Sequence, residues 1–308
     1  MGFDEMDVEQ IWMDGEFVDW EDAQIHVLTH GLHYGTGVFE GVRAYDTERG
    51  PALFRWEDHL DRLYDSAKPY DIEIPYEPAE LTAATTELLD REGLDSCYVR
   101  PIAFYGYDML GVNPADAPVR VAIAAWPWGT YLGEEALEEG VDVGVSSWRK
   151  HASSQIPTNS KVTGAYINSV LASLEAERNG YVEAIVLNKE GNVAEGPGEN
   201  IFLIEDGELY TTPLSASILG GITRDTVIEL ARERGYSVTE RPISRGELYT
   251  ADELFFSGTA AEVTPIRSVD DVEIGTGTKG PVTDELQAAF FDLVERRPPE
   301  HEEWFRPI

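Results

Sequence analysis

Short apolar runs separated by turn residues characterise the first 55 positions, which predicts strands joined by tight turns. The segment IWMDGEFVDW is apolar on both sides of Asp14-Gly15, and an Asp-Gly pair between such runs predicts a β-hairpin. Residues 37–55 predict a second pair of strands. The longer-period patterns and their boundary residues predict helices at about 56–68, 79–92, 164–178, 222–234 and 281–295.

The rest of the chain continues this mixture of strands and helices. Further strands are expected at 96–106, 119–128, 141–148, 236–243 and 252–258, with hairpins turning at Glu190-Gly191 and Asp206-Gly207. Strands that pair with their sequence neighbours indicate an α/β or α+β protein with mostly antiparallel sheets. A Rossmann fold is disfavoured because no glycine fingerprint links a first strand to a helix. The polar segment 129–140 is the expected linker between a domain over 1–128 and a second domain over 141–308.

Composition agrees with two packed domains and narrows the cellular setting. The chain has 308 residues, of which 42% are hydrophobic, and this is enough for a real core. Cys97 is the only cysteine, so no disulfide within the chain is expected. The amino terminus lacks the pattern of a secretory signal, and no apolar run approaches membrane-spanning length. A soluble, cytoplasmic protein is therefore expected.

The acidic balance of the chain describes its environment more than its chemistry. A formal net charge of −35 disfavours nucleic acids and anionic membranes as partners. A DNA mimic or a cation buffer is one interpretation, but the charges are spread along the whole chain and form no block. Many acidic residues with little lysine favour adaptation to high salt, in which dense counter-ions screen the self-repulsion of the protein.

The scarcity of lysine draws attention to one lysine in the segment IPTNSKVTGAY. Lys161 lies there among small and hydroxyl residues, five positions before Tyr166. Arginine supplies most of the positive charge elsewhere, yet its guanidinium never loses its proton, whereas a partly buried lysine can become a nucleophile. A solvated surface lysine is the alternative interpretation, which the motifs further along the chain oppose.

Those downstream motifs describe a site for a phosphate-bearing aldehyde. Glu195 lies between a predicted strand and a glycine-rich turn, although a solvated hairpin carboxylate is the alternative. Gly220-Gly221 precedes a predicted helix, whose first amides would hold a phosphate, and residues 257–260 offer a second such turn. Pyridoxal phosphate requires a lysine, a carboxylate for its pyridine nitrogen and donors for its phosphate.

The complete set of motifs resembles one known family. The segments are HGLHYGTGVFEGVRAY, YVRP, GVNP, PWGTYLG, IPTNSKVTGAY, EGPGENIF, GGITRD and SGTAAEVTP. They resemble the branched-chain amino acid aminotransferases of the fold-type IV, or class IV, pyridoxal phosphate enzymes over residues 11–291. The resemblance implies transfer of the amino group between L-leucine, L-isoleucine or L-valine and 2-oxoglutarate, with pyridoxal phosphate as cofactor and no metal.

The resemblance also assigns roles at the cofactor. Lys161 would form the Schiff base and then move a proton from substrate Cα to the cofactor. Glu195 would pair with the pyridine nitrogen, and Tyr166 would hydrogen-bond the phenolic oxygen of the ring. Arg62 would bind the phosphate, with a salt bridge on a helix surface as its alternative role. The remaining cofactor contacts implied by the resemblance are Leu219 against the ring and Ile222, Thr223 and Thr259 at the phosphate.

For the substrate, the resemblance implies an apolar chamber that must also admit glutamate. Arg100 would meet the side-chain carboxylate of glutamate or 2-oxoglutarate, and a structural ion pair is the alternative. Tyr98 and the Thr259-Ala260 turn would take the α-carboxylate. The chamber walls would be Phe39, Trp128, Tyr131 and Tyr166, with Tyr34 and Val112 contributed by the partner subunit of a homodimer or higher homo-oligomer.

Three other functions are weighed against this one. The family also includes D-amino acid aminotransferases and aminodeoxychorismate lyases, which share the lysine and the glutamate. The complete YVRP, GVNP and SGTAAEVTP set favours the branched-chain enzyme over both. A non-catalytic acidic binding protein would not need Lys161, Glu195 and Arg62 together.

Overall fold

The computed structural model describes residues 8–129 and 132–308, which fold into two compact units. The first unit contains the chain up to Trp128 together with Ser160–Ala165 and Val294–Ile308. The second unit contains Gly129–Asn159 and Tyr166–Leu293. No helix in the described part of the chain has the length and apolar character needed to cross a membrane.

The first unit is built on an antiparallel sheet. Its strands are β1 (Gln10–Met13), β2 (Glu16–Asp19), β3 (Gly37–Phe39), β4 (Val42–Tyr45), β5 (Ala52–Phe54), β6 (Cys97–Tyr105), β7 (Val119–Trp126) and β17 (Phe305–Pro307). Within the described residues they form an 8-stranded sheet in the order β17-β5-β4-β6-β7-β1-β2, and β3 pairs with β6. The predicted hairpin at Asp14-Gly15 is confirmed: both residues have positive φ, 51° and 96°, as a type I′ turn requires.

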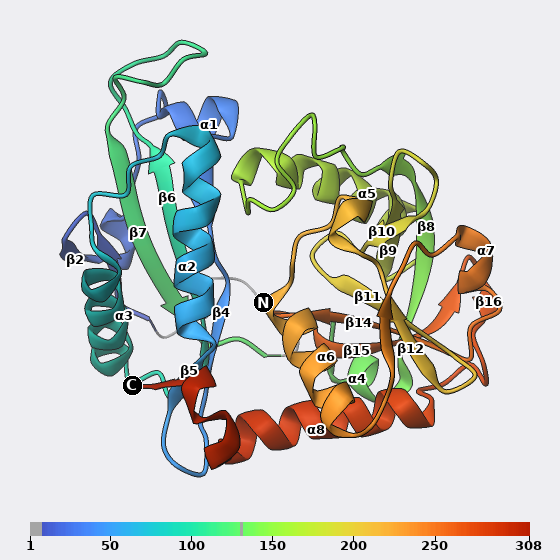
Figure 1. Ribbon diagram of the computed structural model, residues 1–308. Helices are drawn as coiled ribbons and strands as arrows, with labels where there is room; N and C mark the ends of the chain where they lie inside the picture. Colours follow the sequence, from blue (N-terminus) through green and yellow to red (C-terminus); the bar gives the residue numbers. More distant parts are fainter. Residues whose placement is uncertain (1–7, 130–131) are drawn as a thin grey trace. The chain divides into compact units, whose positions relative to one another are not determined.

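Helices cover this sheet and complete the core of the first unit. They are α1 (His30–Tyr34), α2 (Trp56–Ala67) and α3 (Pro78–Glu92). Figure 1 shows α2 lying along one face of the sheet, while α3 packs on β1 and β7. The first turn of α3 is stabilised by Pro78 and by a capping box between Glu77 and Glu80. The buried faces of both long helices supply Trp56, Leu63, Leu81 and Leu88 to the core.

The second unit contains a mixed sheet. Its strands are β8 (Val141–Arg149), β9 (Glu183–Leu187), β10 (Val193–Glu195), β11 (Asn200–Glu205), β12 (Glu208–Thr211), β13 (Val238–Glu240), β14 (Glu253–Gly258), β15 (Glu262–Val269) and β16 (Val272–Glu273). The order within the described residues is β10-β9-β8-β15-β14-β11-β12-β13, with β16 paired to β15. The pairs β8·β9, β8·β15 and β12·β13 are parallel, and the other pairs are antiparallel.

Helices connect several strands of the second sheet. They are α4 (Glu134–Glu139), α5 (Tyr166–Arg178), α6 (Ile222–Glu233), α7 (Arg245–Leu248) and α8 (Pro281–Arg296). The α5 helix provides the crossover between the parallel strands β8 and β9, and it packs on both. The apolar core of this unit includes Ile185, Val193, Ile201, Phe256 and Ile266.

The predicted helices and hairpins are present, but the division of the chain differs from the predicted linear one. The predicted linker 129–140 contains helix α4. Two segments assigned to the second domain by sequence, Ser160–Ala165 and Val294–Ile308, belong to the first unit. Strand β17 shows the reason for the latter, because it pairs with β5 and so extends the first sheet. The periodicity of a sequence indicates pairing between neighbouring strands, and it does not indicate that a segment from the end of the chain joins a sheet formed near its start.

Candidate active site

The main chain of Lys161 is fixed within the first unit. Its N–H donates to Ser66 Oγ of α2 at 2.9 Å, and its carbonyl accepts from Phe39 N of β3 at 3.1 Å. The next residue, Val162, forms an isolated antiparallel bridge with Val38. The lysine segment is therefore held by a strand and a helix that precede it by about a hundred residues.

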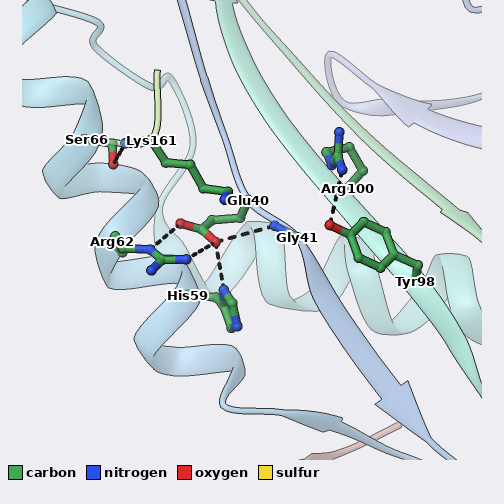
Figure 2. Close-up of polar contacts among 8 residues, drawn as sticks. All are labelled: Glu40, Gly41, His59, Arg62, Ser66, Tyr98, Arg100 and Lys161. Atoms are coloured by element: carbon green, nitrogen blue, oxygen red, sulfur yellow. Dashed lines mark hydrogen bonds and ion pairs between the residues drawn. The ribbon is translucent and has the colours of Figure 1, made fainter. Parts of the chain in front are cut away.

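The side chain of Lys161 lies in surroundings that lower its proton affinity. Burial lowers the pKa of Lys161 from 10.5 to about 8, against the opposing influence of Glu40. The Nζ atom is 5.1 Å from the centre of the Phe39 ring. Figure 2 shows the side chain extending toward the carboxylate of Glu40. An amine with this pKa is partly neutral near physiological pH, as a nucleophile or general base must be.

Glu40 lies at the centre of a buried polar cluster with Arg62 and His59. Arg62 donates from Nε to Oε1 at 2.7 Å and from Nη2 to Oε2 at 2.8 Å, and His59 Nδ1 lies 2.7 Å from Oε2 (Figure 2). Burial alone would raise the pKa of Glu40, but Arg62 and His59 together hold it well below its usual value. Burial lowers the pKa of His59, and the neighbouring Glu40 opposes this shift. Because Glu40 is only 1% exposed, Arg62 is not part of a surface salt bridge.

Arg100 lies among aromatic rings of the same unit. Its guanidinium carbon is 4.9 Å from the centre of the Phe39 ring and 5.2 Å from that of Tyr98, and Nη2 donates to Tyr98 Oη at 3.1 Å. No carboxylate pairs with Arg100 within the described residues, and its buried Nε has no hydrogen-bond acceptor there. The alternative of a structural ion pair is therefore not supported. The arrangement leaves a cation available to a carboxylate ligand.

Tyr98 also organises the aromatic wall predicted for the substrate. Its ring centre is 5.3 Å from those of both Trp126 and Trp128. A Cβ added at Gly41 would lie 1.8 Å from Tyr98 Oη, so only glycine lets this hydroxyl reach its place. Tyr131, the other aromatic residue predicted next to Trp128, lies outside the described residues.

In the second unit, Glu195 ends β10 as a buried carboxylate with three donors. Lys150 Nζ lies 2.6 Å from Oε1, while Asn200 Nδ2 and the Leu219 amide donate to Oε2 at 3.2 and 3.1 Å. Asn200 also donates to the carbonyl of Leu219 at 2.9 Å. The structure thus brings together Glu195 and Leu219, two residues predicted for the cofactor site, through the side chain of Asn200. A solvated hairpin carboxylate is excluded by the 5% exposure of Glu195.

Helix α6 begins where the sequence predicted a phosphate turn. Gly221 is its N-cap, and Ile222 and Thr223 are the first two helical residues. A Cβ at Gly221 would lie 2.0 Å from Asn200 Oδ1, so the glycine allows the helix to start against Asn200. The amides at the start of a helix of this length, together with its dipole, favour an anion.

The other predicted residues are distributed over both units. Thr259 and Ala260 form the turn between β14 and β15, and Tyr166 is the first residue of α5, all in the second unit. Tyr34 and Val112 lie in the first unit and are 45% and 83% exposed. The first unit therefore also contains the predicted residues Lys161, Arg62, Phe39, Tyr98, Arg100 and Trp128. The second unit contains Glu195, Leu219, Ile222, Thr223, Thr259, Ala260 and Tyr166.

Four residues with polar contacts to the predicted site were not anticipated from the sequence. They are Glu40, His59, Lys150 and Asn200. Lys150 carried a usable signal, since lysine is rare in this chain and this one follows a predicted strand. Glu40 and His59 had none, because the chain is rich in acidic residues and their partners are distant in sequence. No group of three or more His, Cys, Asp or Glu side chains in residues 8–129 and 132–308 is arranged to hold a metal ion.

Comparison with known proteins identifies the family. Residues 37–269 match the amino-transferase class IV model. A branched-chain-amino-acid aminotransferase of Pseudomonas aeruginosa is 53% identical over 294 residues, which cover 96% of this chain and 95% of the relative. The chain belongs to the class IV aminotransferases. It is therefore an enzyme that transfers amino groups, and its substrates are small amino and oxo acids.

Solved structures of this family share the whole fold with the chain. The crystal structure of the Escherichia coli branched-chain amino acid aminotransferase superposes with a TM-score of 0.95 at 49% identity, over 97% of this chain and 98% of that one. The corresponding enzyme of Thermobaculum terrenum in its PLP form superposes with a TM-score of 0.91 at 34% identity, over 98% and 99%. The aminotransferase fold therefore extends beyond residues 37–269 to almost the entire chain.

Proposed function

We propose that this aminotransferase moves the amino group between L-leucine, L-isoleucine or L-valine and 2-oxoglutarate, giving branched-chain 2-oxo acids and L-glutamate. The observation that carries the proposal is 53% identity, over nearly the whole of both chains, to a relative named as a branched-chain enzyme. The environment of Arg100 supports the glutamate side of the reaction, because this cation lies among aromatic rings and has no carboxylate partner in the part of the chain that the structure describes.

The cofactor is pyridoxal phosphate, as in the class IV relative solved in its PLP form. When bound, it supplies an aldehyde for the amino group and a ring that accepts electrons from the substrate. Lys161 is the amine with the lowered pKa, and we assign it the bond to the cofactor and the transfer of the proton at substrate Cα. Glu195 is a buried carboxylate at the end of β10, and we assign it the pyridine nitrogen.

The phosphate would be held by donors of three kinds. Arg62 contributes a guanidinium and α6 contributes the amides of Ile222 and Thr223. The third donor is Thr259, in the turn between β14 and β15. We assign the phenolic oxygen of the cofactor to the hydroxyl of Tyr166 and one face of its ring to Leu219. These assignments fit the donor set that the chain presents and follow the family resemblance residue by residue.

For the substrate, we assign each carboxylate to separate residues. Arg100 would take the side-chain carboxylate of glutamate or 2-oxoglutarate, and Tyr98 with Thr259 and Ala260 would take the α-carboxylate. A branched aliphatic side chain would lie against aromatic rings, where burial of its apolar surface favours binding. The proposed apolar walls are Phe39, Trp128, Tyr131 and Tyr166, with the partner subunit's Tyr34 and the partner subunit's Val112.

A homodimer is part of this proposal. The two segments that contain Tyr34 and Val112 are joined in the first unit, since His30 Nε2 lies 2.7 Å from Gly111 O. Side chains exposed on these segments include several large apolar ones, a pattern typical of protein interfaces. Val112→Asp should therefore shift the protein toward monomer in analytical ultracentrifugation, and an unchanged sedimentation coefficient would contradict the proposed role of Val112.

The substrate assignment is tested by the visible absorption of the bound cofactor. Addition of L-leucine should change the absorption band, and addition of 2-oxoglutarate should then restore it. D-alanine should leave the band unchanged. A response to D-alanine with none to L-leucine would replace this proposal by the D-amino acid aminotransferase activity.

A further inference from the structure

Glu40 has a position in the first unit that its role in the fold does not require. It follows the last residue of β3 and precedes Gly41, so its side chain leaves the sheet at a short break between two strands. The carboxylate is 1% exposed and carries a full charge. A buried ion pair of this kind stabilises a fold little compared with an apolar core of equal volume, so another reason for its presence is needed.

The contacts of Glu40 fix the orientation of a second side chain. Arg62 donates to both carboxylate oxygens, at 2.7 and 2.8 Å, which locks the plane of its guanidinium. His59 and the amide of Gly41 hold the carboxylate from other directions, at 2.7 and 3.4 Å to Oε2. The pair therefore has one geometry, which neither a lysine nor a shorter acid would reproduce.

The guanidinium oriented in this way is near the reactive lysine. Figure 2 shows the side chains of Arg62 and Lys161 both directed at the Glu40 carboxylate, from α2 and from the segment after Ser160. The pairing with Glu40 accounts for two of the five N–H donors that a guanidinium carries. Arg62 is 14% exposed, whereas Glu40 behind it is buried.

We propose that Glu40 is a positioning residue, which holds the guanidinium of Arg62 in the orientation needed to bind the phosphate of the cofactor. The inference rests on the proposed function, in which Arg62 binds that phosphate. A different role would be competition, in which the carboxylate occupies Arg62 until the phosphate displaces it. The two roles predict opposite effects of removing the charge of Glu40. The buried position and the His59 contact favour positioning, because they leave the carboxylate no path away from Arg62.

The test compares two ligands that differ only in the phosphate. Apoenzyme is titrated with pyridoxal phosphate and with pyridoxal, and the ratio of the two dissociation constants is measured by quenching of tryptophan fluorescence. Both ligands can bond Lys161 in the same way, so the ratio isolates the phosphate. In Glu40→Gln the amide N–H₂ would face donors of Arg62 or His59. The dissociation constant for pyridoxal phosphate should rise about 10- to 100-fold, while that for pyridoxal stays within about threefold.

Further variants separate positioning from a purely structural role. Arg62→Lys keeps the charge but lacks the planar set of N–H donors that a guanidinium carries. It should itself reduce the preference for pyridoxal phosphate over pyridoxal. In the Arg62→Lys enzyme, the additional substitution Glu40→Gln should change the ratio of dissociation constants little, because no guanidinium remains to be oriented. Circular dichroism of each apoenzyme checks the fold. If Glu40→Gln does not fold, Glu40→Asp, which keeps the charge but withdraws it from Arg62, should show the same loss of preference.

The outcomes distinguish the role of Glu40 from the role of Arg62. Equal weakening of both ligands in Glu40→Gln would show a structural role and overturn the inference, and tighter binding of pyridoxal phosphate would establish competition instead. An unchanged preference in Arg62→Lys and in Arg62→Ala would remove Arg62 from the phosphate site and with it that part of the proposed function. If the Arg62 variants lose preference for pyridoxal phosphate but Glu40→Gln and Glu40→Asp do not, the role of Glu40 is refuted and the role of Arg62 stands.

Discussion

Lys161 shows how one side chain acquires reactivity from its neighbours. Burial removes water from the ammonium and disfavours the proton, and the charges of Arg62 and Arg100 act in the same direction. Glu40 opposes them by stabilising the charged form. The balance lowers the pKa of Lys161 to about 8, and without Glu40 it would be lower still.

A pH series on the apoenzyme tests this balance. Lys161 should become half-maximally reactive toward an amine-specific acylating reagent near pH 8, because that is where it loses its proton. A lysine in an unstructured peptide added to the same sample is the control and should react half-maximally about two pH units higher, near the ordinary lysine value of about 10.4. Peptide mass spectrometry reads both sites in one sample. Equal profiles for the two lysines would show that burial does not tune Lys161.

Substitution of Lys161 tests its chemical role. Lys161→Ala should still bind pyridoxal phosphate through Arg62 and the helix amides, but should lose turnover by at least the ~10²–10⁴ of an acid–base group. Borohydride reduction of the unmodified enzyme, followed by peptide mapping, should locate the cofactor on Lys161. Lys150 is the informative control, because it is also largely buried and pairs with Glu195. A label on Lys150 would reassign the role.

Arg100 should separate the two half-reactions. Arg100→Met removes the charge and keeps much of the apolar stem among Phe39 and Tyr98. The half-reaction with glutamate should lose about 1.5–3 kcal/mol, as expected for a hydrogen bond to a charged group. The half-reaction with leucine should change far less. Single-turnover rates with each amino acid, followed through the cofactor spectrum, measure both, and an equal loss in both would assign Arg100 a purely structural role.

At the scale of secondary structure, three elements of the second unit meet at Asn200. This first residue of β11 hydrogen-bonds Glu195 at the end of β10 and the carbonyl of Leu219 just before α6. Helix α6 begins at Ile222, three residues after Leu219, and its N-cap Gly221 lacks the Cβ that would clash with Asn200. The carboxylate predicted for the pyridine nitrogen and the helix predicted for the phosphate are therefore connected through one amide side chain.

A pair of glycine substitutions tests this connection. A methyl group at Gly221 would lie 2.0 Å from Asn200 Oδ1, so Gly221→Ala must displace Asn200. We expect a loss of about 1–3 kcal/mol in the free energy of unfolding and weaker binding of pyridoxal phosphate. Gly220→Ala is the matched control, since its methyl group would lie 3.4 Å from Leu214 Cδ2, an ordinary contact. Equal effects of the two substitutions, by denaturant titration and cofactor binding, would contradict the proposed connection.

At the scale of the whole molecule, the net charge of −35 is the dominant feature. Mutual repulsion of so many carboxylates opposes the compact state, and dissolved ions screen it. Adaptation to high salt therefore stays our prediction, as does a cytoplasmic location. Activity and melting temperature should both rise through a potassium chloride series. Full activity and an unchanged melting temperature in dilute buffer would show that the acidic surface has another purpose.

Much of the local structure could be predicted from the sequence, because it depends on residues close together in the chain. Asp14-Gly15 favours a type I′ turn by its own backbone preferences, and the hairpin follows. The second predicted pair of strands within residues 37–55 also forms, as β4 and β5. The motif around Lys161 marked the residue whose chemistry differs from that of the other cations, and the family comparison confirmed the class of enzyme.

Only the tertiary structure decided which partners surround these residues. The pKa of Lys161, the pairing of Arg62 with Glu40 and the contact of Lys150 with Glu195 each join segments 22 to 121 positions apart in the sequence. The placement of Ser160–Ala165 and of β17 with the first unit is of the same kind. Burial and charge pairing act through space, so a linear pattern of apolar and polar residues determines the elements and the reactive side chains, whereas the packing of distant segments determines how those side chains are tuned.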